Sequence, residues 1–167
     1  MDPRFELVLS FSIPGQPHGK QSVRVAGGRG RKAKKSKLYE EQIARITGAA
    51  ARKAGLVVPL RRMVMLDITA VLARPKNIPV ALRVPVQPGG DLSGRLFAPV
   101  KADWDNIAKS IGDGLQQRSE ISAPVLKDDG LVVRGRVDTV RAAVGESPKV
   151  EVWLWILADP KAWPGQP

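Results

Sequence analysis

Two stretches in the first half of the chain have the apolar pattern of β-strands. In residues 5–13, apolar side chains occupy every second position, and these are Phe5, Leu7, Leu9, Phe11 and Ile13. This alternation predicts a strand with one buried face. Residues 63–73 are apolar on both faces except at Asp67 and Thr69. Such a pattern is typical of a strand that is covered on both sides, either in the interior of a sheet or at an interface.

Two further strands are predicted near the end of the chain, over residues 131–143 and 149–157. In the last strand, alternate positions form one apolar face, and Trp153 and Trp155 lie on the other. Residues 145–148 between the two strands are typical of a turn. We therefore expect the two strands to pair with one another in the antiparallel orientation.

The helical period of 3.6 residues is present in two segments. Over residues 38–54, apolar side chains recur at spacings of three and four, with Ser36 placed to cap the first turn and Gly55 placed to end the helix. A second helix is predicted over residues 104–118. These elements predict an α+β fold, in which two main helices pack on a mixed, mostly antiparallel sheet of about four strands.

Three segments show neither the alternation of a strand nor the 3.6-residue period of a helix. Residues 74–100 hold five prolines and three glycines and are interpreted as an inserted surface loop. Residues 158–167 form a predicted flexible tail, and residues 14–37 form a predicted basic loop. Since none of these segments is large enough for a core of its own, we expect one domain over residues 1–167.

The basic loop carries eight positive charges and no acid over residues 20–37. The segment is either a solvated loop or an arm that binds phosphates, and its length and purely cationic character favour the arm. The residues expected to bind phosphates, which become DNA-binding residues if the partner is DNA, are Lys20, Arg24, Arg29, Arg31, Lys32, Lys34, Lys35 and Lys37.

The composition also favours a polyanionic partner. The 167 residues include 27 Lys and Arg against 16 Asp and Glu, so that the net charge is +11, which is typical of nucleic-acid-binding proteins. The absence of cysteine excludes disulfides, thiolate metal sites and cysteine nucleophiles. No apolar run is long enough to span a membrane, and the N-terminus lacks the pattern of a signal peptide. We therefore expect a cytoplasmic protein.

Against this basic background, acidic residues gather at the start of the second predicted helix. Asp103 and Asp105 are two residues apart, and Lys109 and Asp113 follow at intervals of four residues after Asp105. At about 100° per residue, Lys109 and Asp113 share the helix face of Asp105. The opposite face is apolar and can pack on the sheet; it is formed by Ile107, Ile111 and Leu115.

Asp128 and Asp129 follow this helix and precede the third predicted strand. Taken alone, Asp103 and Asp105 are better explained as acids that favour the N-terminal end of the helix dipole. Their combination with further carboxylates and with Lys109 changes this interpretation. Mg²⁺ prefers hard oxygen ligands, and a nearby lysine can stabilise charge on a phosphate oxygen. The sequence therefore predicts a metal site for phosphate chemistry.

The order of these motifs matches a known pattern. The chain contains Asp-x-Asp-Asn-x-x-Lys at residues 103–109, Asp-Gly-Leu at residues 113–115 and Asp-Asp-x-x-Val at residues 128–132. Upstream, Ile-Pro-Gly-Gln-Pro at residues 13–17 precedes the basic segment. With these motifs, residues 8–157 resemble the phage-type branch of the RusA family of Holliday-junction resolvases.

The resemblance implies roles for individual residues. The family's three metal-site carboxylates and its essential lysine are the expected catalytic residues, and they correspond here to Asp103, Asp105, Asp129 and Lys109. Asp113 and Asp128 correspond to recurring acids and are possible accessory residues.

The resemblance also implies a RusA-like fold and a homodimeric endonuclease that depends on Mg²⁺, for which Mn²⁺ can substitute, and on no small-molecule cofactor. Its expected partner is branched DNA, in which it resolves four-way junctions by paired symmetric nicks during recombination and repair. Two alternatives stay open. One is a metal-dependent nuclease for other branched or single-stranded nucleic acids, and the other is a non-catalytic DNA-binding module whose acids only shape the fold.

Overall fold

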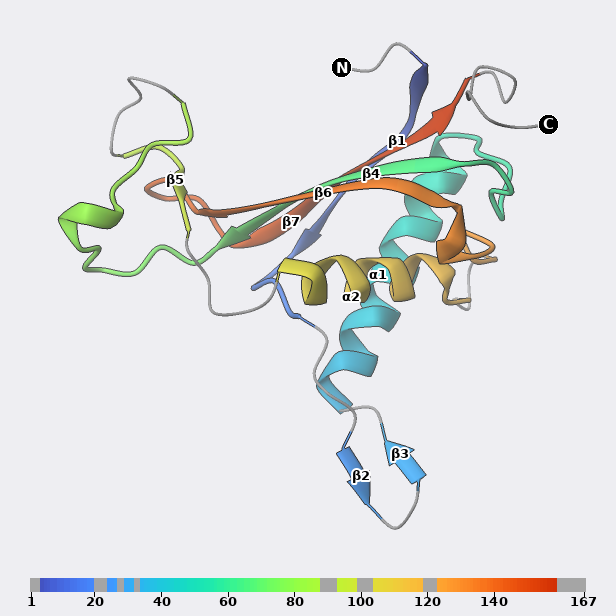
Figure 1. Ribbon diagram of the computed structural model, residues 1–167, viewed down its shortest axis with the longest axis horizontal. Helices are drawn as coiled ribbons and strands as arrows, with labels where there is room; N and C mark the ends of the chain where they lie inside the picture. The colour runs from blue at the N-terminus through green and yellow to red at the C-terminus, as the bar shows by residue number, and fades with distance from the viewer. Residues whose placement is uncertain are drawn as a thin grey trace.

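The protein is an α+β structure in which two helices cover one face of a twisted sheet (Figure 1). The computed structural model describes residues 4–19, 24–26, 29–31, 34–87, 93–98, 104–118 and 123–158. The elements are β1 (Phe5–Pro14), β2 (Arg24–Ala26), β3 (Arg29–Arg31), α1 (Lys34–Lys53), β4 (Val64–Leu72), the 3-10 turn η1 (Val80–Leu82), β5 (Leu96–Phe97), α2 (Trp104–Gln116), the 3-10 turn η2 (Asp129–Leu131), β6 (Val132–Arg141) and β7 (Lys149–Leu157). The predicted fold class is confirmed. No helix in the described ranges is long and apolar enough to cross a membrane.

The main sheet has five strands in the order β1–β7–β4–β6–β5. β4 is central, antiparallel to β7 and parallel to β6, so the predicted interior position of residues 63–73 is confirmed. The predicted pairing of the last two strands is wrong, because β4 lies between them. A strand whose two faces are both apolar is best placed in the interior of a sheet, where it has a neighbouring strand along each edge. The chain after β6 runs past the end of β4, where the Ala142 N–H donates to the Leu72 carbonyl at 2.9 Å.

The side chains of β1 pack in two separate apolar clusters, whereas the sequence predicts one buried face. The pairing of β1 with β7 shifts register between Leu7 and Leu9. Leu9 and Ile13 belong to the main core beneath the helices, whereas Phe5 packs in a separate cluster without any helix residue, together with Met65, Trp155 and Leu157. The prediction that every second residue of this strand shares one face is wrong, because one extra residue at a bulge reverses the alternation of side chains.

α1 begins at Lys34, earlier than residue 38, where the sequence predicts its start. Ser36 is therefore inside the first turn and does not cap it. Its side chain is buried, and its Oγ lies 3.5 Å from Nε2 of His18. The helix ends as predicted: Gly55 has a φ of 66°, and its N–H donates to the carbonyl of Arg52 at 3.1 Å.

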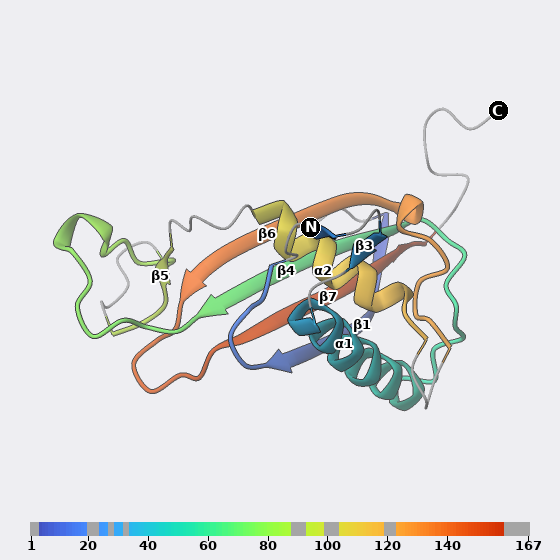
Figure 2. The ribbon, with the colours of Figure 1, turned by 90° about the horizontal axis from the view of Figure 1, so that it is seen from below.

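α2 crosses α1 at a point of very close approach. A Cβ atom at Gly114 would lie 2.6 Å from both Cβ and Cγ2 of Ile43, which is fully buried. The predicted apolar face of α2 is also buried, with Ile107, Ile111 and Leu115 exposed by 3% or less. The crossing therefore fixes which way α2 is turned about its axis, where it lies beside α1 under the sheet (Figure 2).

Residues 74–98 contain a strand that the sequence does not predict. β5 is only two residues long and pairs with the end of β6. A strand this short has no detectable alternation. The predicted count of about four strands is therefore one too low, since β5 is the fifth strand of the main sheet.

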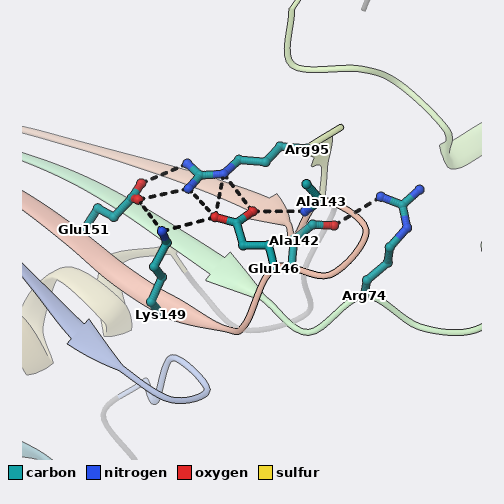
Figure 3. A network of polar contacts seen from close by, with 7 residues as sticks. All are labelled: Arg74, Arg95, Ala142, Ala143, Glu146, Lys149 and Glu151. Atoms are coloured by element: carbon teal, nitrogen blue, oxygen red, sulfur yellow. Dashed lines mark hydrogen bonds and ion pairs between the residues drawn. The ribbon is translucent and has the colours of Figure 1, made fainter. Parts of the chain in front are cut away.

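An ionic network holds these residues to the end of the sheet (Figure 3). Arg95 donates to Glu146 from Nε at 3.0 Å and to Glu151 from Nη1 at 2.8 Å. Lys149 pairs with both carboxylates, at 3.2 and 2.9 Å. Chiefly through the Arg95 hydrogen bonds, the pKa of Glu146 is lowered to about 2. Arg74 donates to the carbonyls of Gly94 and Ala142 at 2.9 and 3.1 Å. The segment is thus attached to the sheet at both of its ends.

Candidate active site

The charged face of α2 carries an ion pair at its start. Lys109 Nζ donates to Asp105 Oδ2 at 2.7 Å, and the two side chains are 56% and 41% exposed. The Lys109 hydrogen bond is the main reason why the pKa of Asp105 lies below its ordinary value. The predicted proximity of Asp105 and Lys109 on one helix face is confirmed. Asp103 lies outside the described residues.

A pocket of about 400 Å³ opens between α2, β4 and β6. Its floor is apolar and is formed by Leu66, Ile68, Ala108, Val132 and Val137. The charged residues that line it are Lys109 and Asp113 from α2, Asp129 from η2 and Arg136 from β6. Three predicted site residues from two separate elements therefore share one pocket. Asp105 does not line the pocket, but its carboxylate accepts a hydrogen bond from Lys109, which does.

The adjacent acids Asp128 and Asp129 are placed differently. The Asp128 carboxylate accepts a hydrogen bond from the Gly130 N–H at 2.7 Å and caps η2. Asp129 instead lines the pocket. Since the Asp128 carboxylate is engaged by the backbone that it caps, the geometry favours Asp129 as the residue available to a ligand.

The donor atoms suit a divalent cation. Asp105, Asp113 and Asp129 offer carboxylate oxygens, which are the hard ligands that Mg²⁺ prefers. Within the described ranges, no three carboxylates or histidines are close enough together to hold a metal ion.

The basic segment contains a hairpin that the sequence does not predict. β2 and β3 pair antiparallel, with Arg24 opposite Arg31, and the hairpin projects away from the sheet beyond the start of α1 (Figure 1). The first turn of α1 holds three more predicted DNA-binding residues, Lys34, Lys35 and Lys37. Lys20 and Lys32 lie outside the described residues.

The segment that leads into this hairpin lies against the start of α2. A Cβ atom at Gly19 would be 3.3 Å from Cβ of Asn106, the neighbour of Asp105. His18 makes an edge-to-face contact with Tyr39 of α1, with ring centroids 5.8 Å apart. Gln16 accepts a hydrogen bond from the Ala73 N–H at 3.0 Å. These contacts place the base of the basic segment next to the Asp105–Lys109 pair.

Sequence reasoning missed one charged residue of the pocket, Arg136. Arg134 and Arg136 occupy equivalent alternate positions of β6, opposite Met65 and Asp67 of β4. Nothing in the local sequence distinguishes these two arginines. Only the packing of α2 beside β6 identifies Arg136 as a pocket residue.

A family model described as endodeoxyribonuclease RusA matches residues 14–154, from the last residue of β1 into β7. The chain belongs to the RusA family. The resemblance found in the sequence motifs is thus confirmed, and the match includes the hairpin, the Asp105–Lys109 pair and the pocket. A search among curated proteins gave no match.

Membership of the RusA family makes the protein an endodeoxyribonuclease of the Holliday-junction resolvase type, whose substrate is branched DNA. Nucleases of this type generally use divalent metal ions. The carboxylate-rich face of α2 and the pocket beside it agree with that chemistry.

Proposed function

We propose that this RusA-family protein is a magnesium-dependent endonuclease that resolves four-way DNA junctions by paired, symmetric nicks in DNA recombination and repair. The observation that carries this proposal is the position of Lys109, which contacts Asp105 and lines the same pocket as Asp113 and Asp129. A lysine among carboxylates suits phosphodiester hydrolysis, since the acids bind a cation and the lysine faces the anionic phosphate.

In the proposed mechanism, Asp103, Asp105 and Asp129 hold Mg²⁺, which Mn²⁺ can replace. The bound ion supplies Lewis acidity and a water of lowered pKa. The Lys109 ammonium offsets the negative charge that develops on the phosphate oxygens in the transition state.

A homodimer follows from the proposed reaction. Two equivalent nicks across a four-way junction require two equivalent active sites, and a two-fold axis between identical subunits supplies them.

The basic segment serves as the proposed DNA-binding arm. At its base, Gly19 lies against Asn106 at the start of α2, and the hairpin of β2 and β3 projects beyond the start of α1. DNA phosphates bound at the base of the arm would therefore lie close to the proposed catalytic residues. The proposed contacts are those of Lys20, Arg24, Arg29, Arg31, Lys32, Lys34, Lys35 and Lys37.

Replacing Lys32, Lys34 and Lys35 by glutamine is expected to weaken binding to all DNA and to flatten its salt dependence. Each lost phosphate contact removes about 0.9 from the slope of log K against log salt, so the slope should fall by about 2.7. Electrophoretic mobility shifts at several salt concentrations measure this. Lys53→Gln, at the opposite end of α1, is the matched control and should leave the slope unchanged. An unaltered slope in the triple variant would show that these three lysines do not contact DNA phosphates.

The proposed function is tested by cleavage of a labelled mobile four-way junction with and without Mg²⁺, with products mapped on all four strands. We expect nicks at symmetric positions on two opposed strands, only with metal. Flapped duplexes and single strands serve as comparison substrates. Equal or faster cleavage of these substrates would favour a nuclease of another substrate class. Metal-independent binding without any cleavage would favour a non-catalytic DNA-binding module.

A further inference from the structure

Exposed basic side chains gather beyond the end of α2, on the side of the molecule where β4 and β6 begin (Figure 1). This basic patch consists of Arg61, Arg62, Arg118 and Lys127, which come from three separate segments of the chain. Within the part of the chain that the structure describes, none of these four side chains has an ion-pair or hydrogen-bond partner. The patch is therefore available to an anion from outside the protein.

Backbone hydrogen bonds hold the three segments of the patch side by side. At the end of α2, the Leu115 carbonyl accepts hydrogen bonds from the N–H groups of Val125 and Leu126, at 2.8 and 3.0 Å. The Leu60 N–H donates to the Val125 carbonyl at 2.8 Å, and the Lys127 N–H donates to the Leu60 carbonyl at 3.2 Å. The patch thus lies on a fixed part of the fold, although its residues are far apart in the sequence.

Two of the cations point to the same side of this ladder. Arg61 and Lys127 each follow a leucine of the bridged pair Leu60 and Leu126, whose side chains are both buried. Successive side chains of an extended chain point to opposite sides, so Arg61 and Lys127 both face away from the core.

Local structure explains only one of the four charges. Arg118 follows the C-terminal end of α2, where the helix dipole favours a cation. Arg61, Arg62 and Lys127 belong to no helix. Like charges that gather on one surface repel one another, so their arrangement favours a polyanionic partner.

The basic patch and the base of the arm lie at two ends of the active-site pocket. Lys127 is two residues before Asp129, which lines the pocket. The base of the arm lies against Asn106, at the start of α2. From Asn106 to Gln116 the helix extends about 15 Å, which corresponds to about four or five nucleotides of one DNA strand. A strand that crosses the pocket along α2 can therefore reach both surfaces.

We propose that the basic patch binds DNA phosphates on the opposite side of the nick from the arm, so that the cleaved strand is held on both sides of the scissile phosphate. This inference rests on the proposed function, which defines the position of the nick. Two acids adjoin the patch, but both have other roles. The Asp128 carboxylate accepts the hydrogen bond of the Gly130 N–H at 2.7 Å, and Asp129 is a proposed metal ligand.

The first test is the salt dependence of junction binding by the variant Arg61→Gln/Lys127→Gln, measured by mobility shifts without divalent ions. The loss of two phosphate contacts should lower the slope of log K against log salt by about 1.8. The charge-matched control is Lys53→Gln/Lys76→Gln, which should leave the slope unchanged. Lys53 lies beside β1 and Lys76 in the segment after β4, and both are exposed. Thermal unfolding of each variant shows whether the fold is retained.

The second test locates the contact on the DNA. Methylphosphonates replace the phosphates about two to five nucleotides from the mapped nick, on one side or on the other. The wild type should lose affinity for both kinds of junction. The patch variant Arg61→Gln/Lys127→Gln should be insensitive to the replacement on one side only. The arm variant, with glutamine at Lys32, Lys34 and Lys35, should be insensitive to it on the opposite side only.

These results separate the inference from the proposed function. If the wild type cuts the junction but the patch variant keeps its salt slope, the inference is overturned while the proposed function stands. Insensitivity of both variants on the same side of the nick also overturns it. If the wild type binds the junction without cutting it, the proposed function fails, and a lowered slope in the patch variant still identifies the patch as a DNA-binding surface.

Discussion

Replacing Asp105 or Asp129 by asparagine is expected to abolish junction cleavage while junction binding stays intact or becomes tighter. Asparagine keeps the shape of the side chain but loses the charge that binds a divalent cation. The cleavage rate should fall by about 10²–10³-fold or more. Binding should not suffer, because removal of an acid lowers the repulsion of DNA phosphates. Single-turnover cleavage and mobility shifts on the same labelled junction measure both quantities.

The neighbouring residue Asp128 provides the control. Asp128→Asn retains an oxygen that can accept the hydrogen bond of the Gly130 N–H, and asparagine caps about as well as aspartate. This variant should therefore keep its fold and most of its cleavage activity. Strong cleavage by Asp129→Asn together with loss of cleavage in Asp128→Asn would reverse the assignment of the two acids.

Gly114→Ala is expected to lower the free energy of unfolding by about 1–3 kcal/mol, because its Cβ would overlap Ile43 at the crossing of the two helices. The loss should occur although alanine favours helices more than glycine does. Gly112→Ala is the matched control in the same helix, since nothing lies within 4 Å of its Cβ position. This control should raise the free energy of unfolding by about 0.5–1 kcal/mol. Urea denaturation of both variants measures the two changes.

In a double-mutant cycle, Gly114→Ala should cost less in an Ile43→Ala background than in the wild type, but it should still destabilise the protein. The overlap involves Cβ of Ile43 as well as its Cγ2 atom, and alanine at position 43 would keep the Cβ. The helices themselves must move apart to relieve the contact. Equal stability changes for the two glycine substitutions, or no cost of Gly114→Ala in the Ile43→Ala background, would contradict this description of the crossing.

The features that the sequence predicts well are those that depend on local spacing. The interval of four residues places Lys109 on the helix face of Asp105 wherever the helix packs, and in the structure the two side chains form an ion pair on that face. The apolar stripe of α2 is likewise buried. The two-sided apolar pattern of residues 63–73 predicts the interior position of β4, since few other environments accept such a strand.

The features that the sequence does not predict depend on distant partners. The bulge between Leu7 and Leu9 leaves no trace in the alternating pattern, because only the register with β7 defines it. The neighbours of β4 are also not predictable from the sequence, because the order of strands along the chain does not reveal their order in the sheet. The presence of Lys109 and Asp129 in one pocket likewise depends on where η2 is placed against α2.

The central sheet also constrains the order in which the protein can acquire its structure. β7 is the hydrogen-bonded neighbour of both β1 and β4, although it is the last strand in the chain. During synthesis from the N-terminus, β1 and β4 are made long before residues 149–157 leave the ribosome. Until then, β1 lacks its neighbour in the main sheet, and β4 can pair only with β6. A nascent chain that stops before β7 therefore leaves β1 and one edge of β4 without hydrogen-bonded neighbours, and unpaired strand edges favour aggregation.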